Sequence, residues 1–156
     1  MLAGPCTLAS YPSGRSRKDL RPAFHAVGEV ARKCLFRQPL RPQMADTIFG
    51  KIARGEAPAE IVYEDDRALA FRDLSPVAPT HILVIPREPL EMLSAASEED
   101  EALLGHLLLV AKKVAQDEGL ENYRVAINNG AGAGQTVFHL HVHVVGGCAF
   151  GTRLGA

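Results

Sequence analysis

Residues 139–145 alternate histidine with leucine or valine, and this run constrains the fold more than any other part of the chain. His139, His141 and His143 are spaced two residues apart, and successive side chains of a β-strand point to opposite faces of its sheet. The run therefore predicts a strand with three imidazoles on one face and aliphatic side chains packed in the core. Three titratable rings on one face indicate an enzyme, because imidazole serves as nucleophile, acid, base or ligand near neutral pH.

Two helices are predicted from capping residues and apolar spacing. Asp46 or Thr47 can cap a short helix over residues 48–54. Ser97 and the three acidic residues after it predict the start of a long helix, since acidic groups stabilise the positive end of the helix dipole. That helix is expected to end at Gly119. We interpret His106, within its leucine-rich run, as a packing or subunit-interface histidine.

The remaining apolar segments predict further strands and a fold class. They are residues 61–63, 68–71, 81–85 and 123–128. The near-continuous apolar run over 81–85 favours a central strand that is covered on both faces. Strands in consecutive runs with segregated helices, and no repeated βαβ unit, predict an α+β fold with a mostly antiparallel sheet.

Charge divides the chain into a basic arm, a body and a tail. Residues 1–45 hold eight basic and two acidic residues, against nine basic and sixteen acidic in the remainder. The arm, 1–43, fits either a transit peptide or a basic disordered extension before an internal start at Met44. We accordingly expect a cytoplasmic protein, or a mitochondrial or plastid one if the arm is a transit peptide. The single domain is expected over 46–147, with a tail at 148–156.

Composition also limits the classes of partner. An acidic body disfavours sequence-specific nucleic-acid binding, and no stretch approaches the roughly 20 apolar residues of a membrane span. The three cysteines show no C-x-x-C spacing or disulfide framework. No metal is expected at the histidine run either, because His139 and His143 would lie roughly 13 Å apart along a strand, too far to bind one ion at about 2 Å each.

Phosphorus chemistry suits the histidine run better. A central histidine can attack phosphorus through one nitrogen while a hydrogen bond holds the other, and its neighbours can stabilise the developing charge. The glycine-rich loop at 128–136 leads into the run, and its backbone N–H groups can form a nest for an anion. Thr136 adds a hydroxyl beside the phosphate or leaving group. The loop does not match the P-loop pattern.

Together these segments resemble the histidine triad (HIT) superfamily, in its nucleotide-binding (HINT) branch. The resemblance rests on the run at 139–145, on Gly146-Gly147, and on residues 46–52, 71–74 and 79–86. It covers about residues 46–147 and leaves out the arm. It implies a HIT-like α+β homodimer that needs no cofactor. It implies a hydrolase that releases nucleoside monophosphate and amine from purine nucleoside phosphoramidates such as those of AMP and GMP.

The resemblance also assigns roles to residues. His141 would be the nucleophile that becomes adenylylated, His143 and His139 would contact phosphate and support the leaving group, and His81 would lie in the same site. The nucleotide would be bound by Ile48, Phe49, Ile52, Phe71, Asp73, Leu74, Asn128, Gly134, Gln135 and Thr136, together with His141 and His143. Without the resemblance, the apolar members would be taken as core, and Asp73, His81 and Asn128 as structural residues.

The chain departs from the family pattern in three places. Relatives with a zinc-binding Cys-x-x-Cys carry it where this chain has Thr47 and Gly50. Thr136 stands where serine is more usual. The tail lacks the branch's Trp-Pro-Pro ending, which leaves the preferred leaving group open. The alternatives are a dinucleoside polyphosphate hydrolase or nucleotidyltransferase of another branch, and a nucleotide-binding regulatory protein.

Overall fold

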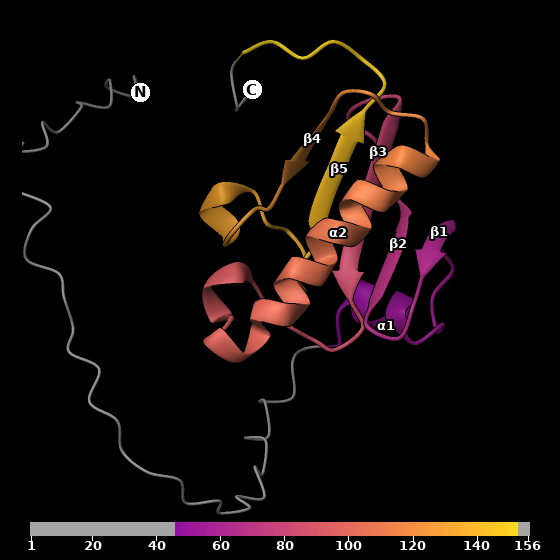
Figure 1. Ribbon diagram of the computed structural model, residues 1–156. Coiled ribbons are helices and arrows are strands. Elements are labelled where there is room, and N and C mark those ends of the chain that lie inside the picture. Colours follow the sequence, from indigo (N-terminus) through magenta and orange to yellow (C-terminus); the bar gives the residue numbers. More distant parts are fainter. Residues whose placement is uncertain (1–45, 153–156) are drawn as a thin grey trace, which may run out of the picture. The chain divides into compact units, whose positions relative to one another are not determined.

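The computed structural model describes residues 46–152, which form one antiparallel sheet with helices on both faces (Figure 1). The elements are α1 (Ile48–Ala53), β1 (Ile61–Glu64), β2 (Ala68–Arg72), β3 (Thr80–Pro86), η1 (Leu93–Ala95), η2 (Glu98–Asp100), α2 (Glu101–Asp117), β4 (Tyr123–Ala126), η3 (Ala131–Ala133) and β5 (Val142–Gly146). The basic arm lies outside the described residues, so the transit-peptide interpretation stays a prediction.

The five strands pair in the order β1-β2-β3-β5-β4, and every pairing is antiparallel. The predicted α+β fold is therefore confirmed. β3 is the central strand, and all of its residues except Thr80 are buried. β5 enters between β3 and β4, so the last strand of the described residues lies in the interior of the sheet. This placement brings the histidine run against residues from the first half of the domain.

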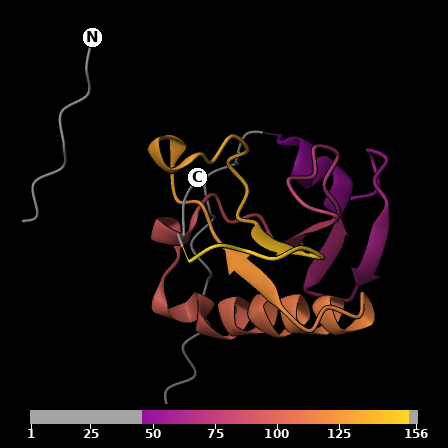
Figure 2. The same ribbon diagram turned by 90° about the horizontal axis from the view of Figure 1, so that it is seen from above.

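The larger core lies between the sheet and α2, which crosses one face of it (Figure 1; Figure 2). Leu140, Val142 and Val144 point into this core beside Ile82 and Val84 of β3, as the alternation predicts. No helix in the described part of the chain is both long and apolar enough to cross a membrane.

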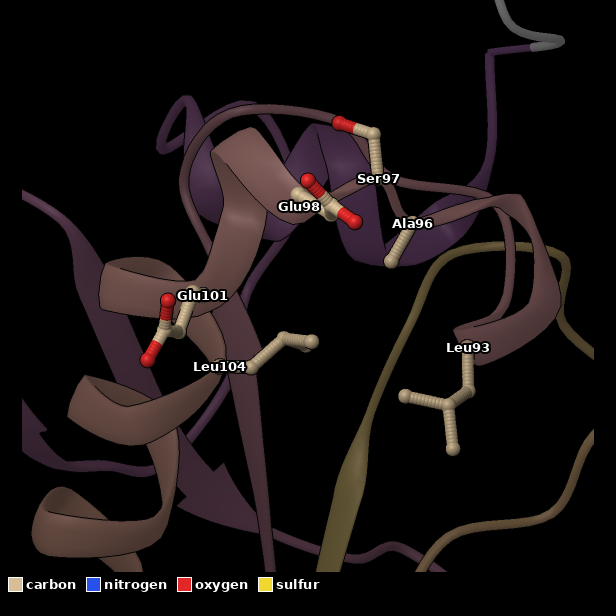
Figure 3. A pocket seen from close by; sticks show the side chains of 6 residues that line it. All are labelled: Leu93, Ala96, Ser97, Glu98, Glu101 and Leu104. Carbon is tan, nitrogen blue, oxygen red and sulfur yellow. The ribbon is translucent and has the colours of Figure 1, made fainter. Parts of the chain in front are cut away.

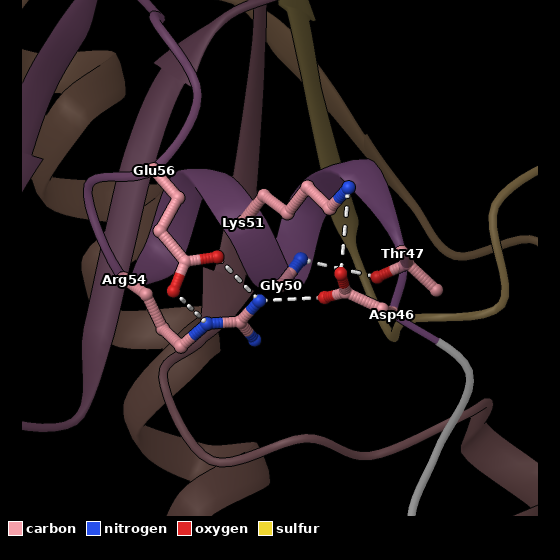
Figure 4. Close-up of polar contacts among 6 residues, drawn as sticks. All are labelled: Asp46, Thr47, Gly50, Lys51, Arg54 and Glu56. Atoms are coloured by element: carbon pink, nitrogen blue, oxygen red, sulfur yellow. Dashed lines mark hydrogen bonds and ion pairs between the residues drawn. The ribbon is translucent and has the colours of Figure 1, made fainter.

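The opposite face carries α1 and a smaller core. Ile52 packs there with Leu69, Phe71, Leu83 and Ile85. Thr47, rather than Asp46, caps α1: its hydroxyl accepts a hydrogen bond from the backbone nitrogen of Gly50 at 3.0 Å. Asp46 instead pairs with Arg54 at 2.5 Å, and Figure 4 shows Arg54 held between Asp46 and Glu56.

His106 ties α2 to the turn between β1 and β2. Its Nε2 lies 2.8 Å from a carboxylate oxygen of Asp65, and its Nδ1 lies 2.7 Å from the Arg67 guanidinium. Because arginine only donates, Nδ1 of His106 accepts from Arg67, and Nε2 is protonated and donates to the Asp65 carboxylate. His106 is thus a hydrogen-bonded packing residue within the subunit.

The prediction of one regular strand over 139–145 is wrong in its first half. β5 begins at Val142, so His139 and His141 precede the ladder. The backbone nitrogen of Leu140 donates to the carbonyl of Leu90, outside the sheet. The side chains still alternate before β5. Leu140 packs in the α2 core, and the side chains of His139 and His141 therefore lie on the opposite, α1 face.

Candidate active site

His81 and His143 form the centre of a polar cluster on the α1 face of the sheet. His81 lies on β3 and His143 on β5, where it is paired with Leu83. The Nε2 atom of His81 lies 2.9 Å from the Nδ1 atom of His143, although 62 residues separate them in sequence. The predicted grouping of His81 with the histidine run is thus formed by the pairing of β3 with β5.

Backbone contacts determine which nitrogens of this pair carry protons. The backbone N–H of Val77 donates to Nδ1 of His81 at 3.4 Å, so Nδ1 accepts and Nε2 is protonated. His81 then donates to Nδ1 of His143, which leaves the proton of neutral His143 on Nε2. That nitrogen is buried and has no hydrogen-bond partner in the described chain. The pair therefore ends in an N–H group that lacks an acceptor.

His141 has the opposite tautomer. Its Nδ1 lies 2.8 Å from the carbonyl oxygen of His139, and because a carbonyl only accepts, Nδ1 carries the proton. Nε2 of His141 is then the nitrogen with a lone pair. The rings of His141 and His143 are edge to face, with centroids 4.9 Å apart. A basic nitrogen and an N–H donor thus lie on neighbouring rings.

His139 is placed differently from the other two triad histidines. It is 1% exposed, and its Nε2 donates to the carbonyl of Pro86 at 2.9 Å. It lies on the α1 face, as the alternation predicts, because Nδ1 of His139 would be 3.8 Å from a Cβ atom at Gly50, but the ring is buried rather than open to the site. Its ring faces inward, where it joins the end of β3 to the segment before β5. It supports His141 through its backbone carbonyl.

Burial favours the neutral form of these rings. The pKa of His143 is lowered from 6.5 to about 4, first by burial and then by the neighbouring histidines. Burial also lowers the pKa of His81, against the opposing charge of Asp73, and that of His139. At neutral pH the rings of His81, His139 and His143 are therefore neutral, in the tautomers that their partners select.

Aromatic side chains line the site on the α1 side. The Phe49 ring packs edge to face with His141 at 5.2 Å and with Phe71 at 5.4 Å. Ile52 and Phe71 are buried in the smaller core and lie behind Phe49, and these three side chains are called the aromatic wall of the site below. Ile48 is 50% exposed, and Leu74 is 93% exposed. The structure thus brings Phe49, Ile52 and Phe71 to the wall, while Leu74 does not join it.

Asp73 lies at the polar end of this wall, directly after β2. Its backbone nitrogen donates to the carbonyl of His81. One carboxylate oxygen accepts from the backbone of Ser75 at 2.8 Å, and the other lies 3.5 Å from Nδ1 of His81. Asp73 is thus close enough to stabilise a proton on His81.

The glycine-rich loop is held from inside by Gln135. The Gln135 side chain is 2% exposed; it donates to the carbonyls of Glu91 and Val137 and accepts from the backbone of Gly130. Its side-chain amide is therefore engaged within the protein. Thr136 is exposed. Asn128 lies against Gly134, which has a positive φ of 86° and would be strained with any side chain.

Sequence reasoning gave no role in the site to the loop that precedes β3. Val77 contributes only its backbone N–H, which no residue pattern reveals. Gly147 helps to position this loop: its φ is 83°, and a Cβ atom there would lie 3.0 Å from Cβ of Pro79. The glycine pair after the histidine run was the available signal.

A separate hollow of about 780 Å³ opens at the start of α2 (Figure 3). It is lined by Leu93, Ala96, Ser97, Glu98, Glu101 and Leu104. None of these is a predicted site residue, and its two carboxylates would repel a phosphate. The histidine cluster is therefore the better candidate for anion chemistry.

Comparison with known proteins identifies the family. The family model of the HIT domain matches residues 54–149. The chain belongs to the HIT domain family. An uncharacterised HIT-like protein of Synechocystis sp. is 63% identical over 106 residues, which are 67% of this chain and 93% of that protein.

Solved HIT structures share the fold. A HIT family hydrolase from Legionella pneumophila is 44% identical, with a TM-score of 0.68 over 69% of this chain and 98% of that one. A histidine triad protein from Clostridium difficile is 43% identical, with a TM-score of 0.67 over 69% of this chain and 96% of that one.

The zinc site of some HIT proteins does not fit this chain. A Zn-bound histidine triad family protein from Mycobacterium smegmatis is 34% identical, with a TM-score of 0.57 over 64% of this chain and 73% of that one. A Cβ atom at Gly50 would lie 3.8 Å from Nδ1 of His139 and 3.4 Å from the Thr47 hydroxyl. At the two positions that a zinc-binding Cys-x-x-Cys would occupy, this chain has a hydroxyl and no side chain.

Asp73, His81 and His143 also offer three ligand atoms within 4.8 Å of one another. The two imidazoles, however, already share a hydrogen bond at 2.9 Å. Two nitrogens bound to one tetrahedral zinc at about 2.0 Å each lie roughly 3.3 Å apart. An ion there would have to break this hydrogen bond.

Proposed function

We propose that this HIT protein is a purine nucleoside phosphoramidase that hydrolyses the P–N bond of substrates such as adenosine 5′-phosphoramidate. One observation carries the proposal: the unprotonated Nε2 of His141 lies on the ring next to the unpartnered Nε2–H of His143. The first is a nucleophile for phosphorus, and the second is a donor for the phosphate or the leaving nitrogen. A buried N–H without an acceptor costs about 1–3 kcal/mol, which favours an incoming anion.

The aromatic wall supports a nucleoside as the bound group. Phe49, which is half-buried and packs on the buried ring of Phe71, offers an apolar surface for a purine next to the histidine that would attack its phosphate. Asp73, at the polar end of the wall, has carboxylate oxygens of the kind that accept ribose hydroxyls. The glycine loop with Asn128 and Thr136 would bind phosphate oxygens.

The reaction would take place in two steps. A bound phosphate favours the imidazolium form of His143, because negative charge raises a histidine pKa. A proton taken up from solvent at Nδ1 of His81, beside Asp73, lets His81 pass its Nε2 proton to Nδ1 of His143, which keeps its own proton on Nε2. Nε2 of His141 attacks phosphorus, the P–N bond breaks, and His143 gives its Nε2 proton to the departing amine. Water then attacks the nucleotidyl-histidine, returns a proton to His143, and releases AMP and His141.

The test is release of AMP from adenosine 5′-phosphoramidate, with a chelator present, by the full chain and by His141→Ala. We expect turnover by the parent and none by the variant. Acid-quenched protein analysed by mass spectrometry should carry one adenylyl group on His141. An active His141→Ala protein would contradict the proposal. Loss of the parent's turnover on adding chelator would indicate a metal-dependent site instead.

Two alternatives share the binding site. A dinucleoside polyphosphate hydrolase or nucleotidyltransferase would use the same nucleophile with a phosphate leaving group, and it would prefer diadenosine polyphosphates in the same assay. A regulatory nucleotide-binding protein would bind AMP without turnover.

We further propose that the protein is a homodimer through α2 and β4. Leu108 and Leu109 are exposed large apolar side chains on α2, and Val125 is exposed on the edge strand β4. Exposed apolar residues beside an unpaired strand edge favour association with a second copy. Sedimentation of the full chain should give a dimer, and Leu109→Glu should give a monomer.

A further inference from the structure

The helix that carries Phe49 is short, and a residue from a distant part of the chain holds its end. α1 has six residues, and a helix of this length is not stable through its local interactions alone. Three carbonyls of its last turn accept from the backbone nitrogens of residues 54–56. The carbonyl of Ala53 accepts instead from the guanidinium of Arg87 at 3.0 Å, 34 positions along the chain.

Arg87 directly follows β3 and joins three segments. Besides the Ala53 carbonyl, its guanidinium donates to the carbonyl of Asp65 at 2.5 Å and to a carboxylate oxygen of Glu64 at 2.8 Å. These acceptors lie at the end of α1, in the turn between β1 and β2, and at the end of β1. Because a guanidinium presents five N–H donors in a rigid plane, one side chain holds all three segments in a fixed arrangement.

α1 supplies two of the three side chains of the aromatic wall. Phe49 lies edge to face with His141, with ring centroids 5.2 Å apart, and Ile52 packs in the smaller core. Thr47 caps the start of the helix and Arg87 holds its end, and Phe49 lies between them. A shift of α1 would therefore move the apolar surface that we assign to the purine.

The histidines of the site do not depend on the Arg87 side chain. The backbone N–H of Arg87 donates to the carbonyl of Arg67, and the carbonyl of Pro86 accepts from Nε2 of His139. These bonds use main-chain atoms at positions 86 and 87, so they persist when the guanidinium is removed. His141 is oriented in turn by the carbonyl of His139. A substitution of Arg87 should therefore disturb the wall and leave His141 in place.

We propose that Arg87 is a positioning residue for nucleotide binding, which keeps α1, and with it Phe49, in the conformation that receives the purine. This inference rests on the proposed binding of a purine nucleotide. Arg87 acts through α1 and makes no contact with the nucleotide. When only a fraction of the molecules has α1 in place, the apparent Kd rises in inverse proportion to that fraction. Bound nucleotide then restores the helix, so kcat at saturating substrate is kept.

The test compares the full chain with Arg87→Gln, which removes the charge and the guanidinium fork. We expect the Kd for AMP, measured by calorimetry, to rise by about tenfold, the lower end of the range for a hydrogen bond to a charged group. KM for adenosine 5′-phosphoramidate should rise in parallel, and kcat should stay within about twofold of the parent's value. Amide hydrogen exchange should become faster in α1 alone, and saturating AMP should reverse this change.

Two further variants control the comparison. Arg72→Gln makes the same charge change and removes ion pairs with Glu60 and with Glu118 at the end of α2. It should lower stability and keep the parent's Kd for AMP. Arg87→Lys keeps the charge without the fork and should have an intermediate Kd. This variant also keeps the test valid if Arg87→Gln folds poorly.

The outcomes separate this inference from the proposed reaction. An unchanged Kd in Arg87→Gln, an equal rise in Arg72→Gln, or a fall in kcat as large as the rise in KM would overturn the role of Arg87. A parent protein that binds AMP but does not cleave the phosphoramidate would contradict the proposed hydrolysis, and the Kd values would still decide this inference. A parent protein that binds no AMP would overturn both.

Discussion

His81 offers the sharpest test of the tautomer chain. In His81→Ala the Nδ1 atom of His143 loses the donor that lies 2.9 Å away, and nothing then selects the tautomer with the proton on Nε2. A buried polar atom left without its partner costs about 1–3 kcal/mol. At about 1.4 kcal/mol per factor of ten, kcat should fall by roughly 5- to 150-fold. KM should change little, because the wall and the loop that bind nucleotide are unaltered.

The assay measures kcat and KM for adenosine 5′-phosphoramidate in His81→Ala and in His81→Gln. The glutamine amide can donate to Nδ1 of His143 and should recover part of the lost kcat. His106→Gln, a histidine change on the other face of the sheet, serves as the matched control and should keep the parent's kcat. Urea unfolding of each variant separates lost activity from lost stability.

Two results would refute this reasoning. If His81→Ala keeps the parent's kcat, the hydrogen bond between the two rings does not select the tautomer of His143. If the alanine and glutamine variants lose the same amount, the donor at position 81 is not what matters. A loss confined to KM would place His81 in substrate binding instead.

Two further predictions concern stability. His106→Leu keeps the side-chain volume but removes the hydrogen bond to the Asp65 carboxylate, and it should lower the free energy of unfolding, measured in urea, by about 2 kcal/mol. His106→Gln can both donate and accept, so it should lose much less. Equal losses in the two variants would show that packing alone matters. Because the pKa values of His143, His81 and His139 are all lowered from 6.5, to about 4 for His143, the unfolded chain binds more protons below pH 6.5. The free energy of unfolding should be at its maximum above that pH and should decline as the pH falls toward 4. The decline should be shallower in His143→Asn. A free energy of unfolding that does not change over this pH range would contradict neutral buried rings.

Local patterns in the sequence determined the helices and strands, and they showed which residues could carry out chemistry. Capping at Thr47 and Ser97 and the apolar spacing of α2 predicted both helices, because these depend on residues within one or two turns. The alternation at 139–145 predicted which side chains face the core. It could not show that the ladder starts only at Val142, since pairing depends on a partner strand elsewhere in the chain.

The tertiary structure decided which of the predicted residues act together. The pairing of β3 with β5 joined His81 to His143, and the loop before β3 supplied the Val77 N–H that sets their protons. His139 is buried and donates to the carbonyl of Pro86, although its spacing in sequence does not distinguish it from the other two histidines. Residue type and spacing are recorded along the chain, whereas register, burial and hydrogen-bond partners arise only when distant segments pack. The sequence therefore determined the histidines, and the fold assigned their separate roles.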